Sequence, residues 1–237
     1  MSFRRIGIMG GTFDPIHWGH LEAAFAAETA LKLQRLLVIT SNVPPHREMP
    51  RASSYHRFAM VALAVAGRNG WRASDLELRL DTESYTATTL KQFHERGYAP
   101  AELFFVIGAD AFTEIQSWKD YPNVLEYAHF AVVSRPGFPV DDLPHRLPNL
   151  AERMVKPPLD EMSHLDPMIV LIEAPTSKVS SSEIRDKRSS GQTIAGLVPD
   201  PVRQHIEQHG LYTSPTPGRR ASDDSPAAIP GRIHGED

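Results

Sequence analysis

The sequence predicts an α/β fold, namely a Rossmann-like, doubly wound and mainly parallel sheet with helices on both faces. Short apolar runs alternate with longer amphipathic stretches along most of the chain, a pattern typical of strand–helix–strand units. A glycine-rich segment, residues 10–20, separates the first apolar run from the first amphipathic stretch. Because such sheets bind ligands beyond the carboxyl ends of their strands, we expect one shared site at that edge.

The period of the apolar residues distinguishes the expected strands from the expected helices. The predicted strands are residues 6–9, 36–40, 74–80, 103–107, 130–133 and 169–172. The predicted helices are residues 21–33, 54–66, 87–96, 111–117, 182–189 and 199–209. Residues 137–167, rich in proline and charge, are expected to form a connection with one short helix.

Length and composition predict one globular domain over residues 1–213, followed by a tail. With 237 residues the chain is long enough for one domain with a proper core. Residues 214–237 combine proline, glycine and mixed charge with little to bury, which predicts a disordered tail.

Charge and residue usage exclude several classes of protein. A formal net charge of -4 gives no indication of a nucleic-acid partner. The absence of cysteine excludes disulfides, thiolate nucleophiles and cysteine-bound metals, and it agrees with a cytoplasmic location. No apolar run approaches the ~20 residues of a membrane span, and the first residues do not resemble a signal peptide.

The glycine-rich segment carries the strongest chemical signal. A turn of this kind between a strand and a helix lets backbone N–H groups face an anion at the helix N-terminus. His17 and His20 are three residues apart, so on a helix they share one face. Together with donors from Gly10, Gly11 and Thr12, they predict a polyphosphate site. The pattern G-x-x-x-x-G-K-[ST] is absent, so the segment is not a P-loop.

Simpler structural roles remain open for the same residue types. The two histidines can cap a helix, satisfy buried polar groups or bind a metal ion. Asp110 can be the N-cap of the helix that follows it, and Arg185 can be a solvated arginine on a serine-capped helix. Trp118 can cover the core as a large apolar side chain.

Several stretches, taken in order, resemble the H-x-G-H nucleotidyltransferase superfamily and, within it, the bacterial nicotinate-nucleotide adenylyltransferases. The signature is His17-Trp18-Gly19-His20. The other matching stretches are residues 44–47, 84–86 with 89–90, 107–111 followed by Trp118, 134–137, 179–185, 197–199 and 210–212. One departure is Arg47, where many members have lysine, since arginine offers a bidentate fork and lysine a point charge.

The resemblance implies an ATP site. His17, His20 and Arg185 would be catalytic, because they would stabilise the charge that develops as pyrophosphate departs. Asp110 would accept hydrogen bonds from ribose hydroxyls. The full implied set for ATP is Gly10, Gly11, Thr12, His17, His20, Gly108, Asp110, Arg135, Ser181, Ser182 and Arg185.

The resemblance also implies a site for nicotinate mononucleotide. Trp118 would stack on the electron-poor pyridine ring, and backbone donors at Tyr85 and Thr86 would bind its carboxylate. His46 and Arg47 would clamp its phosphate. The implied reaction is adenylyl transfer from ATP, which gives deamido-NAD and pyrophosphate in NAD biosynthesis.

Mg²⁺ is expected as the cofactor, bound mainly by phosphate oxygens and water rather than by protein ligands. The expected partners are therefore ATP and nicotinate mononucleotide, with no nucleic acid and no membrane, and the oligomeric state stays open. Two alternatives remain: a nucleotidyltransferase for another acceptor, and a nucleotide-binding module without turnover.

Overall fold

The structure is a computed structural model that describes residues 4–42, 49–79, 83–159 and 166–214. The described strands form one sheet in the order β3-β2-β1-β4-β5-β7-β6, and every neighbouring pair is parallel. The strands are β1 Ile6–Gly11, β2 Arg35–Thr40, β3 Trp71–Ser74, β4 Leu103–Gly108, β5 His129–Val133, β6 Met154–Val155 and β7 Ile169–Ile172. The order reverses direction between β1 and β4, so the end of β1 lies at the point where such sheets bind ligands.

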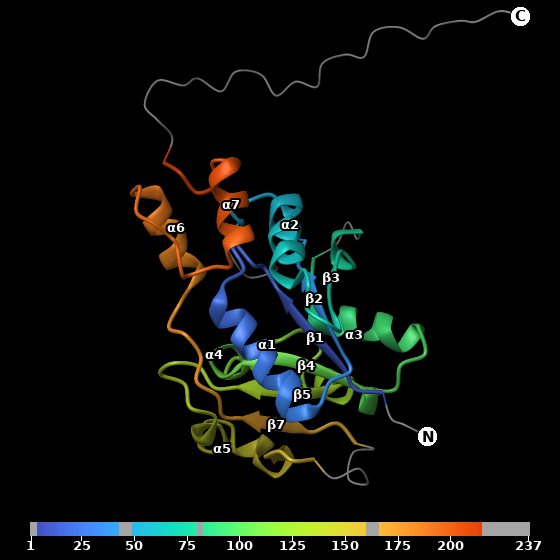
Figure 1. The fold of residues 1–237 in the computed structure, drawn as a ribbon. Coiled ribbons are helices and arrows are strands. Elements are labelled where there is room, and N and C mark those ends of the chain that lie inside the picture. The colour runs from blue at the N-terminus through green and yellow to red at the C-terminus, as the bar shows by residue number, and fades with distance from the viewer. Residues whose placement is uncertain (1–3, 43–48, 80–82, 160–165, 215–237) are drawn as a thin grey trace, which may run out of the picture.

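Helices cover both sides of this sheet (Figure 1). They are α1 Trp18–Leu31, α2 Ser54–Val65, α3 Thr86–Glu95, α4 Ala109–Phe112, α5 Leu143–Arg146, α6 Ser181–Ser189 and α7 Asp200–Gln208. Short 3-10 turns occupy Glu77–Arg79, Pro100–Glu102, Ile115–Ser117, Asn123–Glu126, Val140–Asp142 and Pro148–Arg153. None of the helices in the described ranges is both long and apolar enough to cross a membrane.

The core has two layers, one on each face of the sheet. Alternating strand residues such as Phe104 and Val106 face the layer formed with α1, α2 and α7, while Phe105 and Ile107 face the layer formed with α3, α4 and α5. This alternation is what a strand buried on both faces requires. The predicted doubly wound fold is therefore confirmed.

The predicted strand at residues 74–80 is wrong. Strand β3 ends at Ser74, and a 3-10 turn follows at Glu77–Arg79. Ser74 Oγ accepts a hydrogen bond from the Leu76 N–H at 3.3 Å, and the Asp75 carbonyl accepts one from the Leu78 N–H at 3.0 Å. These local bonds form a turn although the apolar residues alternate as in a strand.

Three other element predictions need correction. The helix predicted at 21–33 begins earlier, at Trp18, so that His17 becomes its N-cap and His20 lies in its first turn. The helix predicted at 111–117 is split into α4 and a 3-10 turn. The connection at 137–167 contains the short strand β6 besides its short helices. The predicted tail, residues 214–237, lies outside the described residues except for Ser214, whose hydroxyl bonds the Ser189 carbonyl at 3.0 Å.

Buried Arg57 supports the loop that joins β1 to α1. The residue is 1% exposed, and its guanidinium donates hydrogen bonds to the carbonyls of Thr12 and Ser41, both at 2.7 Å, and of Asn42 at 3.1 Å. Burial lowers its pKa, while the nearby charge of Asp14 acts in the opposite direction. Arg57 therefore ties the end of β1 to the end of β2, from helix α2.

Buried Asp14 fixes the same loop from the other side. Its carboxylate accepts hydrogen bonds from the backbone N–H groups of Arg51 and Ala52, at 2.8 and 3.1 Å, and from the Tyr212 hydroxyl at 2.7 Å. Burial raises the pKa of Tyr212 far above its usual value, and the Asp14 charge adds to that effect, so the hydroxyl stays a donor. The chain after α7 thus holds the loop that follows β1.

We expect Tyr212→Phe to destabilise the protein by about 1.5–3 kcal/mol, because a buried carboxylate loses a hydrogen-bond donor. Thermal unfolding of the full chain measures this loss. Tyr55→Phe is the matched control, since Tyr55 is 83% exposed and should leave the midpoint unchanged. An unchanged midpoint for Tyr212→Phe would show that the bond to Asp14 does not support the loop.

Candidate functional site

The predicted phosphate-binding segment lies at the carboxyl end of β1. Gly10 and Gly11 are the last residues of the strand, and Thr12 begins the loop. A Cβ at Gly11 would lie 2.9 Å from the ring of Phe13, so the turn leaves no room for a side chain there. The sequence therefore folds into the strand–turn–helix arrangement that presents backbone N–H groups to an anion.

The two signature histidines stack on each other at the start of α1. Their ring centroids are 3.8 Å apart with an interplanar angle of 26°, and the edge of Phe13 contacts His20. The backbone N–H of His17 donates a hydrogen bond to His20 Nδ1 at 3.3 Å. In the neutral His20 ring the proton therefore lies on Nε2. His20 thus caps the helix and keeps an N–H donor on the opposite side of its ring.

His17 is buried and uncharged in the free protein. Its side chain is 2% exposed, and burial, with a smaller contribution from the positive charge of Arg135, lowers its pKa to about 3. Its Nδ1 is buried and has no hydrogen-bond partner among the described residues. A buried polar atom of this kind is costly unless a ligand satisfies it.

Helix α6 brings its predicted residues onto the same loop. Ser181 Oγ donates to the Pro15 carbonyl at 2.9 Å, and Arg185 donates to the Asp14 carbonyl at 2.8 Å. The Arg185 guanidinium also donates to Ser182 Oγ at 3.1 Å, and its Nε is buried with no partner among the described residues. The predicted serines and arginine thus lie directly beside the glycine-rich turn.

A third predicted group joins β4 and β5 to the start of α1. Arg135 donates to the Gly19 carbonyl at 3.0 Å, and a Cβ at Gly19 would lie 2.8 Å from its guanidinium. A Cβ at Gly108 would lie 2.5 Å from the Asp110 carboxylate and 3.1 Å from Cγ of Arg135. The glycines therefore permit a close approach between Asp110, Arg135 and the signature helix.

The residues predicted to bind nicotinate lie at the start of α3 and after α4. Trp118 packs edge-on against Phe105 at 6.1 Å between centroids, and a Cβ at Gly10 would lie 3.7 Å from that same ring. Tyr85 is the N-cap residue of α3, so Thr86 is its first helical residue. The Tyr85 hydroxyl bonds Glu83, and the Lys119 ammonium lies 3.9 Å from the Tyr85 ring centroid.

Two predicted residues, His46 and Arg47, lie outside the described residues. Their proposed role, binding the phosphate of the mononucleotide, stays a prediction.

Sequence reasoning missed the buried charged residues beneath the site. Asp14 lies inside the glycine-rich segment but received no role. Arg57 received none either, although its spacing from the buried residues Met60, Val61 and Ala64 places an arginine on an apolar helix face, which is a recognisable signal.

Glu77 is a further residue that the sequence analysis missed, because it fell inside the wrongly predicted strand. It is 6% exposed and accepts a hydrogen bond from the Thr89 hydroxyl at 2.6 Å. Burial raises its pKa, while hydrogen bonds from Thr89 and Ser84 act in the opposite direction. Ser84 Oγ in turn accepts from the Asn42 N–H at 2.9 Å, so Glu77 links the start of α3 to the end of β2.

One apolar surface cavity lies away from these residues. It has a volume of about 640 Å³, is lined mainly by α1 and the chain after β7, and contains none of the predicted site residues. Its lining includes Trp18, Phe25 and Ile172 and is mostly apolar. A polyphosphate needs converging cations and N–H donors, which the end of β1 supplies and this cavity does not.

Comparison with known proteins agrees with this geometry. The cytidylyltransferase-like family model matches residues 8–187. A protein of Desulfitobacterium hafniense named "Probable nicotinate-nucleotide adenylyltransferase" is 40% identical over 210 residues, which cover 88% of this chain and 96% of that protein. One of Citrobacter koseri with the same name is 36% identical over 206 residues, which cover 86% and 97% of the two chains.

A solved structure shares the fold. It is the Plasmodium falciparum nicotinic acid mononucleotide adenylyltransferase complexed with NaAD, with a TM-score of 0.65 and 20% identity. The match covers 88% of this chain and 97% of that one. From the sequence matches, supported by the shared fold, the chain belongs to the cytidylyltransferase-like family and, within it, to the nicotinate-nucleotide adenylyltransferases.

Proposed function

We propose that this protein joins ATP to nicotinate mononucleotide and releases pyrophosphate and deamido-NAD, a step of NAD biosynthesis. The observation that supports it best is the pair of unpartnered buried nitrogens, His17 Nδ1 and Arg185 Nε, beside one glycine-rich turn. The similarity to named adenylyltransferases over most of the chain agrees with this. A cytoplasmic location, suggested by the cysteine-free sequence, belongs to the same proposal.

The proposed reaction is a direct in-line transfer. An oxygen of the mononucleotide phosphate attacks the α-phosphorus of ATP, a new P–O bond forms, and the bond to the bridging oxygen of the β-phosphate breaks. The electron pair leaves with pyrophosphate. Because the attacking oxygen is already anionic, no side chain has to act as a nucleophile, and catalysis rests on positioning and charge stabilisation.

The signature loop would hold the triphosphate. N–H groups at Gly10, Gly11 and Thr12 would face its oxygens, with His17 and His20 at the helix start. His17 is neutral in the free protein, and a bound polyanion favours its protonated form, so ATP binding would raise its pKa. Because His17 is neutral before ATP binds, the positive charge that is always present near the phosphates would come from Arg185 and Arg135.

Two arginines contact the signature segment from different parts of the fold, Arg185 from α6 and Arg135 from the chain after β5. Arg185 contacts the loop carbonyl of Asp14 from α6, beside Ser181 and Ser182, and Arg135 contacts the Gly19 carbonyl from the end of β5. In this arrangement they would bind the β- and γ-phosphates and stabilise the departing pyrophosphate.

Asp110 would bind the ribose of ATP. It lies in the first turn of α4, and its carboxylate lies close to Gly108. A carboxylate at the end of a central strand accepts hydrogen bonds from ribose hydroxyls in other nucleotide folds. On the same side of the sheet, Trp118 would stack on the pyridine ring.

Mg²⁺ fits this site as an ion carried by the substrate. The Asp14 carboxylate is already engaged by two backbone N–H groups and by Tyr212, so it offers no cage for a cation. Mg²⁺ prefers oxygen ligands and keeps several waters, so the phosphates of ATP would bind it. The ion would neutralise phosphate charge, while residues of this chain position the phosphates.

A panel of acceptors, with pyrophosphate release as the readout, separates the proposal from its alternatives. Nicotinate mononucleotide should be the preferred acceptor. Preference for phosphopantetheine or glycerol phosphate would indicate a nucleotidyltransferase of another specificity. Binding of ATP without turnover on any acceptor would indicate a binding module.

We expect His20→Ala to lower kcat by about 10²–10³, the usual cost of losing one preorganised donor in the transition state. The variant His20→Asn distinguishes the effect of His20 on catalysis from its effect as a helix cap. Its amide oxygen can still accept the His17 N–H bond, so its stability should be near wild type although its kcat is low. His145→Ala, on the exposed surface of α5, should retain full activity. Near-wild-type kcat for both His20 variants would remove His20 from the catalytic set.

We also expect a preference for nicotinate over nicotinamide mononucleotide. The first N–H groups of a helix have no intrahelical partner, and those at Thr86 and beyond would bind a carboxylate. A carboxamide would direct its NH₂ toward one of these donors and leave it unpaired, which costs ~1–3 kcal/mol. The ratio of kcat/KM values should therefore be about tenfold or more. Equal kcat/KM values for the two mononucleotides would contradict carboxylate binding at the start of α3, but they would not contradict adenylyl transfer itself.

A further inference from the structure

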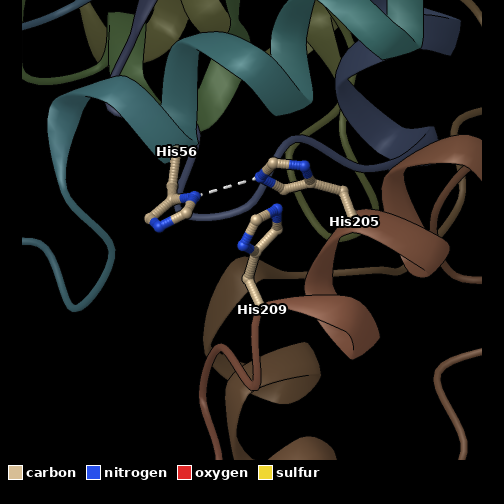
Figure 2. Close-up of side chains that lie close together, drawn as sticks. All are labelled: His56, His205 and His209. Atoms are coloured by element: carbon tan, nitrogen blue, oxygen red, sulfur yellow. Dashed lines mark hydrogen bonds between the residues drawn. The ribbon is translucent and has the colours of Figure 1, made fainter.

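Three histidines that the proposed reaction does not use converge between two helices. His56 lies in the first turn of α2, His205 lies in α7, and His209 is the C-cap residue of α7. Figure 2 shows the three rings turned toward one another across the α2–α7 contact. One ring nitrogen from each lies within 4.8 Å of the others.

The spacing of these nitrogens is close to that of a metal site. His56 Nδ1 and His205 Nε2 are 3.1 Å apart. Two imidazoles on a tetrahedral Zn²⁺, with Zn–N bonds of about 2.0–2.1 Å, have nitrogens about 3.3 Å apart. His209 has to approach by about 1.5 Å at most to complete the set, and because its side chain is exposed it is free to turn.

The chemistry of the three ligands selects the ion. Neutral imidazoles bind Zn²⁺, Cu²⁺, Ni²⁺ and Co²⁺ well, whereas Mg²⁺ and Ca²⁺ prefer oxygen. His205 and His209 are four residues apart on one helix, so they can chelate from one face, and His56 supplies the third ligand from another helix. The exposed side of His209 leaves room for water as a fourth ligand.

We propose that His56, His205 and His209 bind a divalent transition-metal ion, Zn²⁺ first among them, and that the ion holds α7 against α2. The ordinary alternative is a hydrogen-bonded pair, His56 and His205, beside a solvated third ring. That alternative predicts no effect of metal on stability.

The position of the site gives such an ion a structural consequence. His56 is directly followed by Arg57, whose guanidinium bonds the Thr12 carbonyl. His209 is three residues before Tyr212, whose hydroxyl bonds Asp14. A metal bridge at this point would join the two segments that support the β1–α1 loop.

The test uses the full chain without an affinity tag, stripped of metal with a chelator and titrated with Zn²⁺. At a free Zn²⁺ concentration a hundredfold above Kd, the unfolding midpoint should rise by about 5–10 °C. Co²⁺ should give the visible absorption of a tetrahedral site, and Zn²⁺ should abolish it. An equal concentration of Mg²⁺ should do neither.

Four glutamine variants identify the ligands. His56→Gln, His205→Gln and His209→Gln should each weaken Zn²⁺ binding at least tenfold and remove most of the rise in midpoint. His145→Gln, exposed on α5, should behave as wild type. Because His209 is exposed, His209→Gln keeps the test valid even if a variant at one of the other two positions fails to fold.

Two results would overturn the proposal. One is a wild-type protein that shows neither a shift in midpoint nor a Co²⁺ spectrum. The other is binding that persists unchanged in His56→Gln, since the ion would then be chelated by α7 alone and would not bridge the helices.

Discussion

The loop between β1 and α1 depends on charge that is buried beneath it. Arg57 donates hydrogen bonds to backbone carbonyls that follow two strands, and Asp14 accepts them from two backbone N–H groups and a tyrosine hydroxyl. Buried charges are costly unless every hydrogen bond is made. Here the bonds are made to the backbone, so the cost is offset only when the loop has one particular shape. This conformation of the loop also sets the positions of the signature histidines and glycines.

The upper surface of the same loop is left incompletely bonded. Nitrogen atoms of His17 and Arg185 are buried without partners among the described residues, and the burial that isolates His17 also removes its charge. A loop that is held by many hydrogen bonds to Arg57 and Asp14, and that lies beside unpartnered nitrogen atoms, suits a site that is rigid before its ligand arrives. The hydrogen bonds of Arg57 and Asp14 to the loop offset the stability that the unpartnered nitrogens of His17 and Arg185 cost.

Local patterns predicted the fold well where local physics decides it. The β1 strand, the glycine turn and α1 follow from the period of the apolar residues and from turn chemistry. The described residues that were expected to share a site lie at one edge of the sheet, and His46 and Arg47 lie outside the described ranges. The error at residues 74–80 arose because Leu76 and Leu78 alternate like a strand, while bonds to Ser74 and Asp75 close a turn. The supports of the loop were not predicted. The partners of Asp14 are distant in sequence, and the one local signal, Arg57 on the apolar face of α2, does not show which carbonyls its guanidinium would bond.

The bond between Tyr212 and Asp14 joins positions 198 residues apart. Because a chain is synthesised from its N-terminal side, the β1–α1 loop leaves the ribosome well before Tyr212 does. A nascent chain that stops before α7 has the signature histidines but lacks the hydroxyl that fixes the carboxylate beneath them. Formation of the full hydrogen-bond network under the loop is thereby coupled to synthesis of the segment after α7, so a shorter nascent chain would hold the signature histidines less firmly.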